Sequence, residues 1–112
     1  MDGATELGGT SWIVTALDEE PLAVEDPPTI AFDEDGRVSG LGGVNRFTGA
    51  WSADGDVLVL SPLASTRMAG PPERMQLEDR FFAVLGARCT VLATDEGLLL
   101  TSDGGSVRAV GA

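Results

Sequence analysis

The sequence contains no histidine, lysine or tyrosine, so all of its 7 basic residues are arginine. These absences exclude histidine-based acid–base catalysis, Schiff-base formation on lysine and metal sites with imidazole ligands. Against the 7 arginines stand 18 aspartates and glutamates, which give a formal net charge of −11 at pH 7. Such a charge opposes binding to nucleic acid and disfavours self-association. We therefore expect a monomer that does not bind DNA or RNA.

Cysteine is also scarce, because Cys89 is the only one in the chain. A single cysteine cannot form an intramolecular disulfide, which favours a reducing, cytoplasmic environment. The first residues do not have the basic and apolar regions of a signal peptide, and no apolar run is long enough for membrane insertion. The alternative is a cell-envelope protein whose leader is missing from this sequence.

Glycine and proline divide the sequence in a way that indicates a β-rich domain. The chain has 112 residues, of which 43% are hydrophobic, and this suits one folded domain. Turn-forming residues recur at about the 8–12-residue spacing typical of β-rich folds. The expected strands cover residues 10–16, 29–33, 37 onward, 44–51, 57–60, 89–94, 97–102 and 106–110. The acidic segment 18–28 is expected to be irregular and mobile, and residues 63–68 to be extended.

One segment has the pattern of a helix. Gly70-Pro71-Pro72-Glu73 suits the start of a helix, and Gly86 is the expected C-cap. An apolar stripe with helical spacing lies between them: Leu77, Phe81, Val84 and Leu85. Acids lie early in the segment, where the helix dipole favours negative charge: Glu73, Glu78 and Asp79. We predict an α+β fold in which a strongly curved, partly closed, barrel-like antiparallel sheet of about eight strands wraps around one α-helix at Pro72–Leu85.

Familiar catalytic and metal-binding patterns are incomplete in this sequence. Asp33-Glu34-Asp35-Gly36 is similar to the start of a calcium loop, but no acid follows in residues 37–44, and a tight turn explains it better. Gly40-Leu41-Gly42-Gly43 is similar to a phosphate-binding loop, but it leads into an expected strand instead of a helix. Cys89 has no histidine to activate it, so we expect a buried, inert thiol. We predict no catalytic residue, cofactor or metal, and a carboxylate-dependent hydrolase is the least favoured function.

Two polar clusters remain, Asn45-Arg46 and Thr66-Arg67-Met68. Asn45 follows three closely spaced glycines in an expected strand, where asparagine is disfavoured. A residue that breaks a local preference in this way often has a particular structural or functional role. In a structural interpretation, Asn45 satisfies loose backbone groups, while Arg67 lays its stem on apolar surface and pairs its guanidinium with an acid or a carbonyl. In a functional interpretation, the same residues bind a ligand or partner. Both interpretations stay open, and the candidate site residues are Asn45, Arg46, Thr66, Arg67 and Met68.

Four ordered blocks of sequence carry a resemblance to a known family. They are Gly8-Gly9-Thr10-Ser11-Trp12, Gly40-Leu41-Gly42-Gly43-Val44-Asn45-Arg46-Phe47-Thr48-Gly49, Leu63-Ala64-Ser65-Thr66-Arg67-Met68-Ala69-Gly70 and Leu98-Leu99-Leu100. Together they resemble the META domain family, also called the HslJ family, over residues 7–110 as a single domain. The resemblance implies a stress-linked bacterial protein, associated with heat shock and novobiocin resistance, without enzymatic activity or cofactor. It also implies an α+β fold of antiparallel strands partly closed around a helix.

The chain departs from this family at two positions. Family members usually have cysteine where this sequence has Val44 and Gly70. Their joint replacement is expected if they act as a pair in relatives exposed to oxidation, and it favours a cytoplasmic location for this chain. The missing catalytic residue types, together with a curved sheet that leaves one face exposed, lead us to expect a non-enzymatic binding module for a protein or a small apolar ligand. The alternative is an accessory or lipoprotein domain of the cell envelope.

Overall fold

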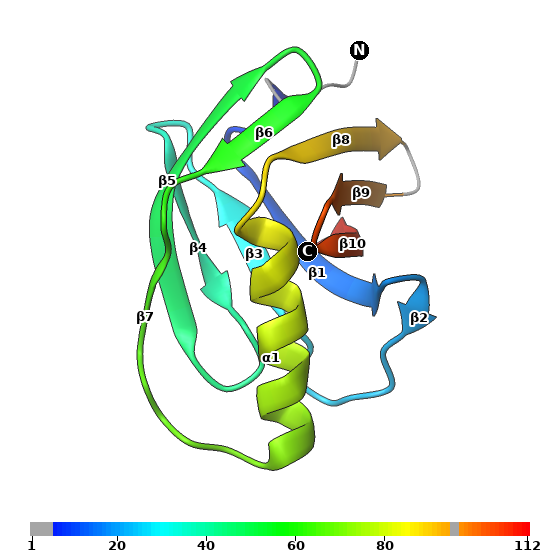
Figure 1. The fold of residues 1–112 in the computed structure, drawn as a ribbon. Coiled ribbons are helices and arrows are strands. Elements are labelled where there is room, and N and C mark those ends of the chain that lie inside the picture. The colour runs from blue at the N-terminus through cyan, green and yellow to red at the C-terminus, as the bar shows by residue number, and fades with distance from the viewer. Residues whose placement is uncertain (1–5, 95–96) are drawn as a thin grey trace.

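A computed structural model describes residues 6–94 and 97–112 of the chain (Figure 1). These residues form ten strands and one helix. In chain order the elements are β1 (Thr10–Leu17), β2 (Glu20–Pro21), β3 (Thr29–Phe32), β4 (Arg37–Leu41), β5 (Arg46–Asp54), β6 (Val57–Leu60), β7 (Ala64–Ser65), α1 (Pro72–Leu85), β8 (Cys89–Thr94), β9 (Gly97–Ser102) and β10 (Gly105–Gly111). The bounds of the helix are those predicted from the sequence.

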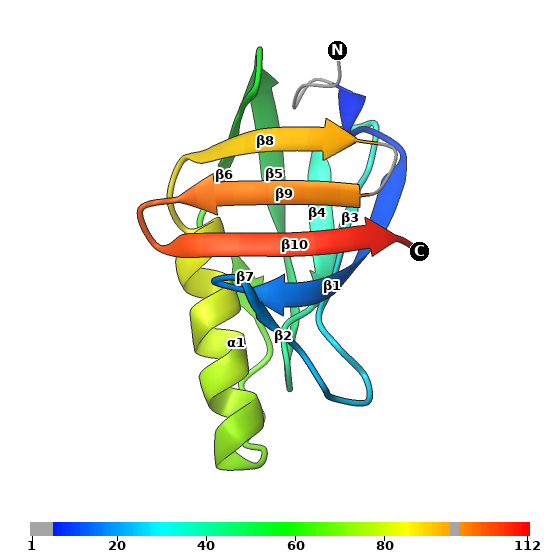
Figure 2. The same ribbon diagram turned by 90° about the vertical axis from the view of Figure 1, so that its right-hand side faces the viewer.

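Eight of the strands form a closed antiparallel barrel. Their order is β10-β9-β8-β6-β5-β4-β3-β1, and β1 pairs with β10 to complete the ring. The short strands β2 and β7 are additions at the edges of β1 and β5, respectively. In Figure 2, β8, β9 and β10 run across β3, β4 and β5, which lie behind them. The predicted α+β fold with about eight curved antiparallel strands is confirmed, and the ring is closed rather than partly closed.

The helix supplies part of the barrel core. The predicted apolar stripe is buried along its whole length: Leu77, Phe81, Val84 and Leu85. The ring of Phe81 meets that of Phe47 from β5 edge to face, with centroids 5.8 Å apart. In Figure 2 the C-terminal end of α1 meets the barrel, and its N-terminal end points away from β8, β9 and β10. The helix ends at Gly86 as predicted, although this residue keeps a right-handed conformation and donates its N–H to Phe82.

The start of β5 differs from the prediction. We expected a strand over residues 44–51, whereas β5 covers Arg46–Asp54 and leaves Val44 and Asn45 outside the ladder. The reason is that the N–H groups of these two residues donate to the side chain of Glu78 on α1. A backbone donor used in this way is not available for strand pairing. Asn45 therefore lies in a loop before the strand, and not within it.

The acidic segment 18–28 is anchored to the helix. It contains the short strand β2, and Arg80 of α1 contacts the Asp18 and Glu20 carboxylates at 3.4 and 3.1 Å. Near its other end, Arg74 of α1 donates to the carbonyl of Asp26 at 2.7 Å. The structure thus gives the predicted irregular segment defined contacts at both ends. Asp95-Glu96-Gly97, between the strands expected at 89–94 and 97–102, has the composition of a turn, but Asp95 and Glu96 lie outside the described residues.

Candidate functional site

A buried carboxylate on α1 organises the loop before β5. Glu78 is only 4% exposed, although it belongs to a helix at the edge of the barrel. Its Oε1 atom accepts three backbone N–H groups, from Gly43 at 3.1 Å, Val44 at 2.9 Å and Asn45 at 2.6 Å. Consecutive N–H groups that converge on one oxygen form an anion-binding nest. In this protein the anion in the nest is part of the chain itself.

The side chain of Asn45 extends this arrangement to the segment before the helix. Asn45 is 3% exposed, and its Nδ2 donates to Glu78 Oε2 at 2.9 Å and to the Met68 carbonyl at 3.2 Å. Its Oδ1 accepts the Thr66 hydroxyl at 2.8 Å and the Met68 N–H at 2.7 Å. These four bonds use the two donors and both acceptor sites of the amide. Asn45 therefore connects α1, the loop before β5 and the segment that carries Thr66 and Met68.

We call residues 61–70, which join β6 to α1 and contain β7, the strap. Thr66 on the strap also accepts the Arg46 N–H at 3.2 Å and donates its own N–H to the Arg46 carbonyl at 3.1 Å, so two hydrogen bonds join the start of β5 to the strap. Met68 uses its backbone for Asn45 and leaves its side chain 57% exposed. The network thus fixes the backbone of the strap and leaves the Met68 side chain in solvent.

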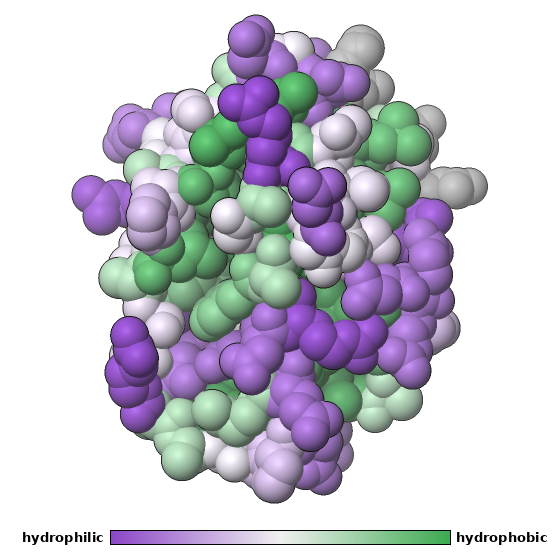
Figure 3. Space-filling model, in the orientation of Figure 1, coloured by the Kyte–Doolittle hydropathy of each residue, from purple (hydrophilic) through white to green (hydrophobic). Residues whose placement is uncertain are grey.

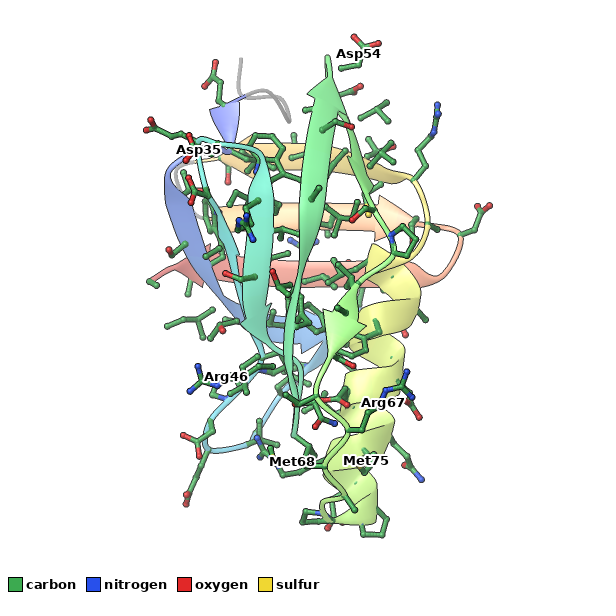
Figure 4. The ribbon with its side chains drawn as sticks, turned by 90° about the vertical axis from the view of Figure 1, so that its left-hand side faces the viewer. Asp35, Arg46, Asp54, Arg67, Met68 and Met75 are labelled. Carbon is green, nitrogen blue, oxygen red and sulfur yellow. The ribbon has the colours of Figure 1, made fainter. Side chains whose placement is uncertain are left out.

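The guanidinium groups of the two candidate arginines lie outside this network. Arg46 and Arg67 are exposed, and neither guanidinium has a hydrogen-bond or ion-pair partner in the described part of the chain. The partner that the structural interpretation expects for Arg67 is therefore not provided there. Figure 4 shows Arg67 beside α1, near Met68 and Met75, while Arg46 lies on the other side of β5.

The sequence pattern does not identify Glu78 as a site residue, because an acid early in a helix is already explained by the helix dipole. Its spacing held a signal that could have identified it. Glu78 lies three and seven residues before Phe81 and Leu85, so helical geometry places it on the buried stripe. A carboxylate at such a position requires hydrogen-bond donors, because an unpaired buried charge is strongly destabilising. The carboxylate at position 78 is therefore explained by its hydrogen bonds to the nest, and not by the helix dipole.

The glycine-rich loop is shaped by this contact. A Cβ atom at Gly42 would lie 2.7 Å from Glu78 Oε1, and one at Gly43 would lie 2.6 Å from the Arg74 carbonyl. Arg74, one turn before Glu78, donates its Nε to the Gly43 carbonyl at 3.0 Å. The segment compared above with a phosphate-binding loop, residues 40–43, does lead into backbone N–H groups that bind an anion. That anion is the Glu78 carboxylate.

The environment of Glu78 favours its charged form. Burial raises the pKa of the Glu78 carboxyl, but hydrogen bonds from the Asn45 side chain and from the backbone of Asn45, Val44 and Gly43 outweigh it. The net result is a pKa below the usual 4.5. The carboxylate is therefore ionised at neutral pH, where both of its oxygens accept hydrogen bonds.

This lowered pKa predicts a loss of stability in acid. A depressed pKa in the folded state gives stabilisation that is complete above the unfolded value of 4.5 and disappears as pH falls through the folded value. The unfolding free energy of wild type should therefore fall relative to that of Glu78→Gln as the pH drops from about 7 to about 3. Urea unfolding of both proteins across this range measures the difference. A wild-type advantage that is constant with pH would contradict the prediction.

A groove runs between the strap and α1. One hollow of about 470 Å³ lies beside the network and is lined by the strap and helix residues Asn45, Ser65, Thr66, Arg67, Met68, Ala69, Met75, Glu78, Asp79 and Phe82. A second hollow, of about 410 Å³, lies between Leu60–Leu63 and the residues Phe82 and Gly86. Because Phe82 borders both, we treat them as one feature, the strap groove. Figure 3 shows apolar surface near the strap and the upper part of α1, bordered by hydrophilic surface over the lower part of the helix.

The other sequence candidates lie apart from the strap groove. Cys89 is fully buried in β8, as predicted, and burial raises the pKa of its thiol to about 11. Asp33, Asp35 and Gly36 form the predicted turn, in which Asp33 Oδ1 accepts the Asp35 N–H at 3.0 Å. Within residues 6–94 and 97–112, no three acidic or cysteine side chains gather as a metal site would require. The same residues include no helix long and apolar enough to cross a membrane.

Comparisons with known proteins point to one family. A family model described as META domain matches residues 5–112. A solved structure described as the NMR structure of a protein from Burkholderia xenovorans is 25% identical, with a TM-score of 0.78, and covers 100% of this chain and 91% of that one. A second NMR structure is 24% identical, with a TM-score of 0.80, and covers 98% and 95% of the two chains; it supports the fold alone. A comparison with curated proteins gave no match.

Proposed function

Because the chain belongs to the META domain family, we propose that it is a non-enzymatic binding module whose contact surface is the strap groove. One observation carries the proposal. The buried bonds of Asn45 and Glu78 fix the backbone of the strap, while the side chains of Arg67 and Met68 stay exposed beside the groove. A surface held in place before binding loses little conformational entropy when a ligand arrives. The ligand class is a protein or a small apolar molecule.

The chemistry of the groove suits such a role. Met75 and Phe82 give it apolar walls on the helix side, and methionine adapts to ligands of different shape. Arg67 adds a guanidinium that has no partner among the described residues. An apolar surface with one free polar group can both hold and orient a ligand.

A non-enzymatic role is supported by the state of the buried acid. A carboxylate-dependent hydrolase needs an acid whose pKa is raised toward neutrality, so that it can hold and release a proton. The pKa of Glu78 is shifted the other way, and both of its oxygens accept hydrogen bonds from the protein. Glu78 is thus a structural acceptor in this proposal.

The cellular setting is part of the same proposal. A stress-response role rests on membership of the family, and a reducing cytoplasmic location rests on Val44 and Gly70 standing at the cysteine positions and on the buried thiol of Cys89. The alternative is an accessory domain of the cell envelope. Cell fractionation with an antibody against the native protein distinguishes the two locations.

A fluorescence titration tests the proposed surface. The probe is 8-anilinonaphthalene-1-sulfonate, an apolar anion that should enter the groove and pair its sulfonate with Arg67. Arg67→Glu and Met75→Gln should each weaken binding about tenfold, because they reverse the charge and remove apolar contact. Arg37→Glu, which makes the same charge change on β4, is the matched control and should bind like wild type. Equal binding by all four proteins, or no binding by wild type, would overturn the proposal.

A further inference from the structure

We propose that the strap groove binds an extended peptide of a partner protein, which adds as a new strand to the free edge of β7. This inference rests on the proposed function, because it names the ligand class of the same groove. It commits to a peptide with alternating apolar side chains and an acidic residue opposite Arg67. The argument depends on the unpaired edge of β7, the side-chain hollows along it and the charge beside it.

The free edge of β7 follows from its pairing. Among the strands of the described residues, β7 pairs with β5 alone, in the register Phe47↔Ser65 and Thr48↔Ala64. The Thr66 N–H donates to the Arg46 carbonyl at 3.1 Å, so the neighbouring Ser65 directs its N–H and C=O away from β5. Figure 4 shows β7 between β5 and α1. The unpaired edge of Ser65 therefore faces the groove.

This edge distinguishes a peptide from a purely apolar ligand. A fatty chain or similar molecule would cover the Ser65 N–H and C=O groups without replacing their hydrogen bonds to water, which is costly. An extended peptide replaces those bonds with its own backbone, as in other cases of strand addition. The exposed edge of the strap is thus complementary to a strand.

The walls of the groove match the side chains of a strand. Successive residues of a strand point to opposite sides, and alternate ones enter neighbouring pockets. Phe82 lines both hollows of the groove, and its ring packs against Phe47 with centroids 5.5 Å apart. Met75 lies in one hollow and Leu63 in the other. Two apolar side chains of one peptide can therefore occupy the two hollows.

The charge near the groove favours an acidic residue in the peptide. Arg67 is exposed and lacks a partner in the described part of the chain, whereas Arg74, Arg80 and Arg108 all bind acids or carbonyls. A carboxylate on the peptide would pair with this guanidinium through a charge-assisted hydrogen bond. Asp79 on the helix side of the groove disfavours a second acid there.

A proline substitution tests strand addition directly. Short random peptides displayed on phage are selected against the whole chain, and the affinity of the selected peptides is measured by fluorescence anisotropy. Ser65→Pro removes the N–H that faces the groove, and the ladder to β5 does not use this group. It should weaken binding about tenfold or more. Ser65→Ala keeps the N–H and should bind like wild type.

A second measurement applies even if Ser65→Pro fails to fold. In wild type, a bound peptide should slow hydrogen exchange of the Ser65 amide and leave that of the Arg37 amide unchanged. Equal affinities of the two Ser65 variants, or unchanged exchange at Ser65, would overturn strand addition. If the anilinonaphthalene probe binds at the groove and no peptide is selected, this inference fails while the proposed function stands. If neither binds, both fail.

Discussion

Replacing Glu78 with alanine is expected to lower the free energy of unfolding by about 3 to 5 kcal/mol. The substitution removes the acceptor for three backbone N–H groups and for the Asn45 Nδ2 atom. These donors are buried, apart from the partly buried Val44 N–H, and each one left without a partner costs about 1 to 3 kcal/mol, less whatever hydrogen bonding to water recovers. Urea unfolding followed by the fluorescence of Trp12 and Trp51 measures the loss.

Two further variants separate the nest from a general effect of helix mutation. Asp79→Ala removes the neighbouring acid, which is exposed, and should change stability by no more than about 0.5 kcal/mol. Glu78→Gln keeps an oxygen for the backbone donors but places an NH₂ group opposite Asn45 Nδ2, which is itself a donor. It should lose about 1 to 3 kcal/mol. Equal losses in Glu78→Ala and Asp79→Ala would contradict the role assigned to the nest.

A double-mutant cycle tests whether Asn45 and Glu78 act as one unit. Asn45→Ala alone should cost about 2 kcal/mol or more, because the Thr66 hydroxyl and the Met68 backbone lose their partner. The double variant should lose less than the sum of the two single losses, since the bond from Nδ2 to Oε2 is removed in both. Additive losses would mean that the two residues stabilise the fold independently.

The elements of the barrel were predictable because each has a periodic signal. In β1, Val14 and Ala16 are buried while Thr15 between them is exposed, as alternation predicts. In α1 the spacing of Leu77, Phe81 and Leu85 identified the buried face and the proline pair identified the start. Such signals depend on local geometry alone. A single sequence carries them without knowledge of the partners that each face will meet.

The candidate site could be predicted only in part. Asn45 attracted notice because it breaks a local rule, and the structure places it at the centre of the network. Its partner Glu78 breaks no such rule in the sequence, since an acid in an amphipathic helix normally faces water. Whether a helical carboxylate is buried depends on a loop more than thirty residues away in sequence, whose donors must reach it. The closure of β1 on β10 is non-local in the same way.

The sequence predicts the extended conformation of the strap but not its position beside α1. Residues 63–68 were expected to be extended, and β7 covers only Ala64–Ser65 of them. Beyond β7, the segment is held mainly by hydrogen bonds to a side chain, because the Thr66 hydroxyl and the Met68 N–H both donate to Asn45 Oδ1. Sequence patterns describe ladders well and individual side-chain contacts poorly. For this reason the groove beside the strap became visible only in the structure.

A pair of cysteines at Val44 and Gly70 is expected to form a disulfide and stabilise the protein. A Cβ atom at Gly70 would lie 3.4 Å from the Val44 Cβ, close to the roughly 3.5 to 4.5 Å that a disulfide requires. The family resemblance implied that these positions act as a pair, and their juxtaposition fits that implication. Valine must be replaced at the same time, because its Cγ2 would lie only 2.6 Å from the new Cβ.

The expected gain in Val44→Cys/Gly70→Cys is about 3 to 4 kcal/mol between the reduced and oxidised forms, from the entropy lost by the unfolded chain when a loop of this length is closed. Urea unfolding with and without a reductant measures this gain, and a thiol assay confirms that only the buried Cys89 thiol stays free after oxidation.

Gly70→Ala alone is the control for the steric conflict: it should destabilise the protein, and Val44→Ala should restore part of the loss. A cysteine pair that stays reduced in air, or an oxidised form no more stable than the reduced one, would show that the strap and the loop before β5 are held too far apart or too rigidly for a bond to form.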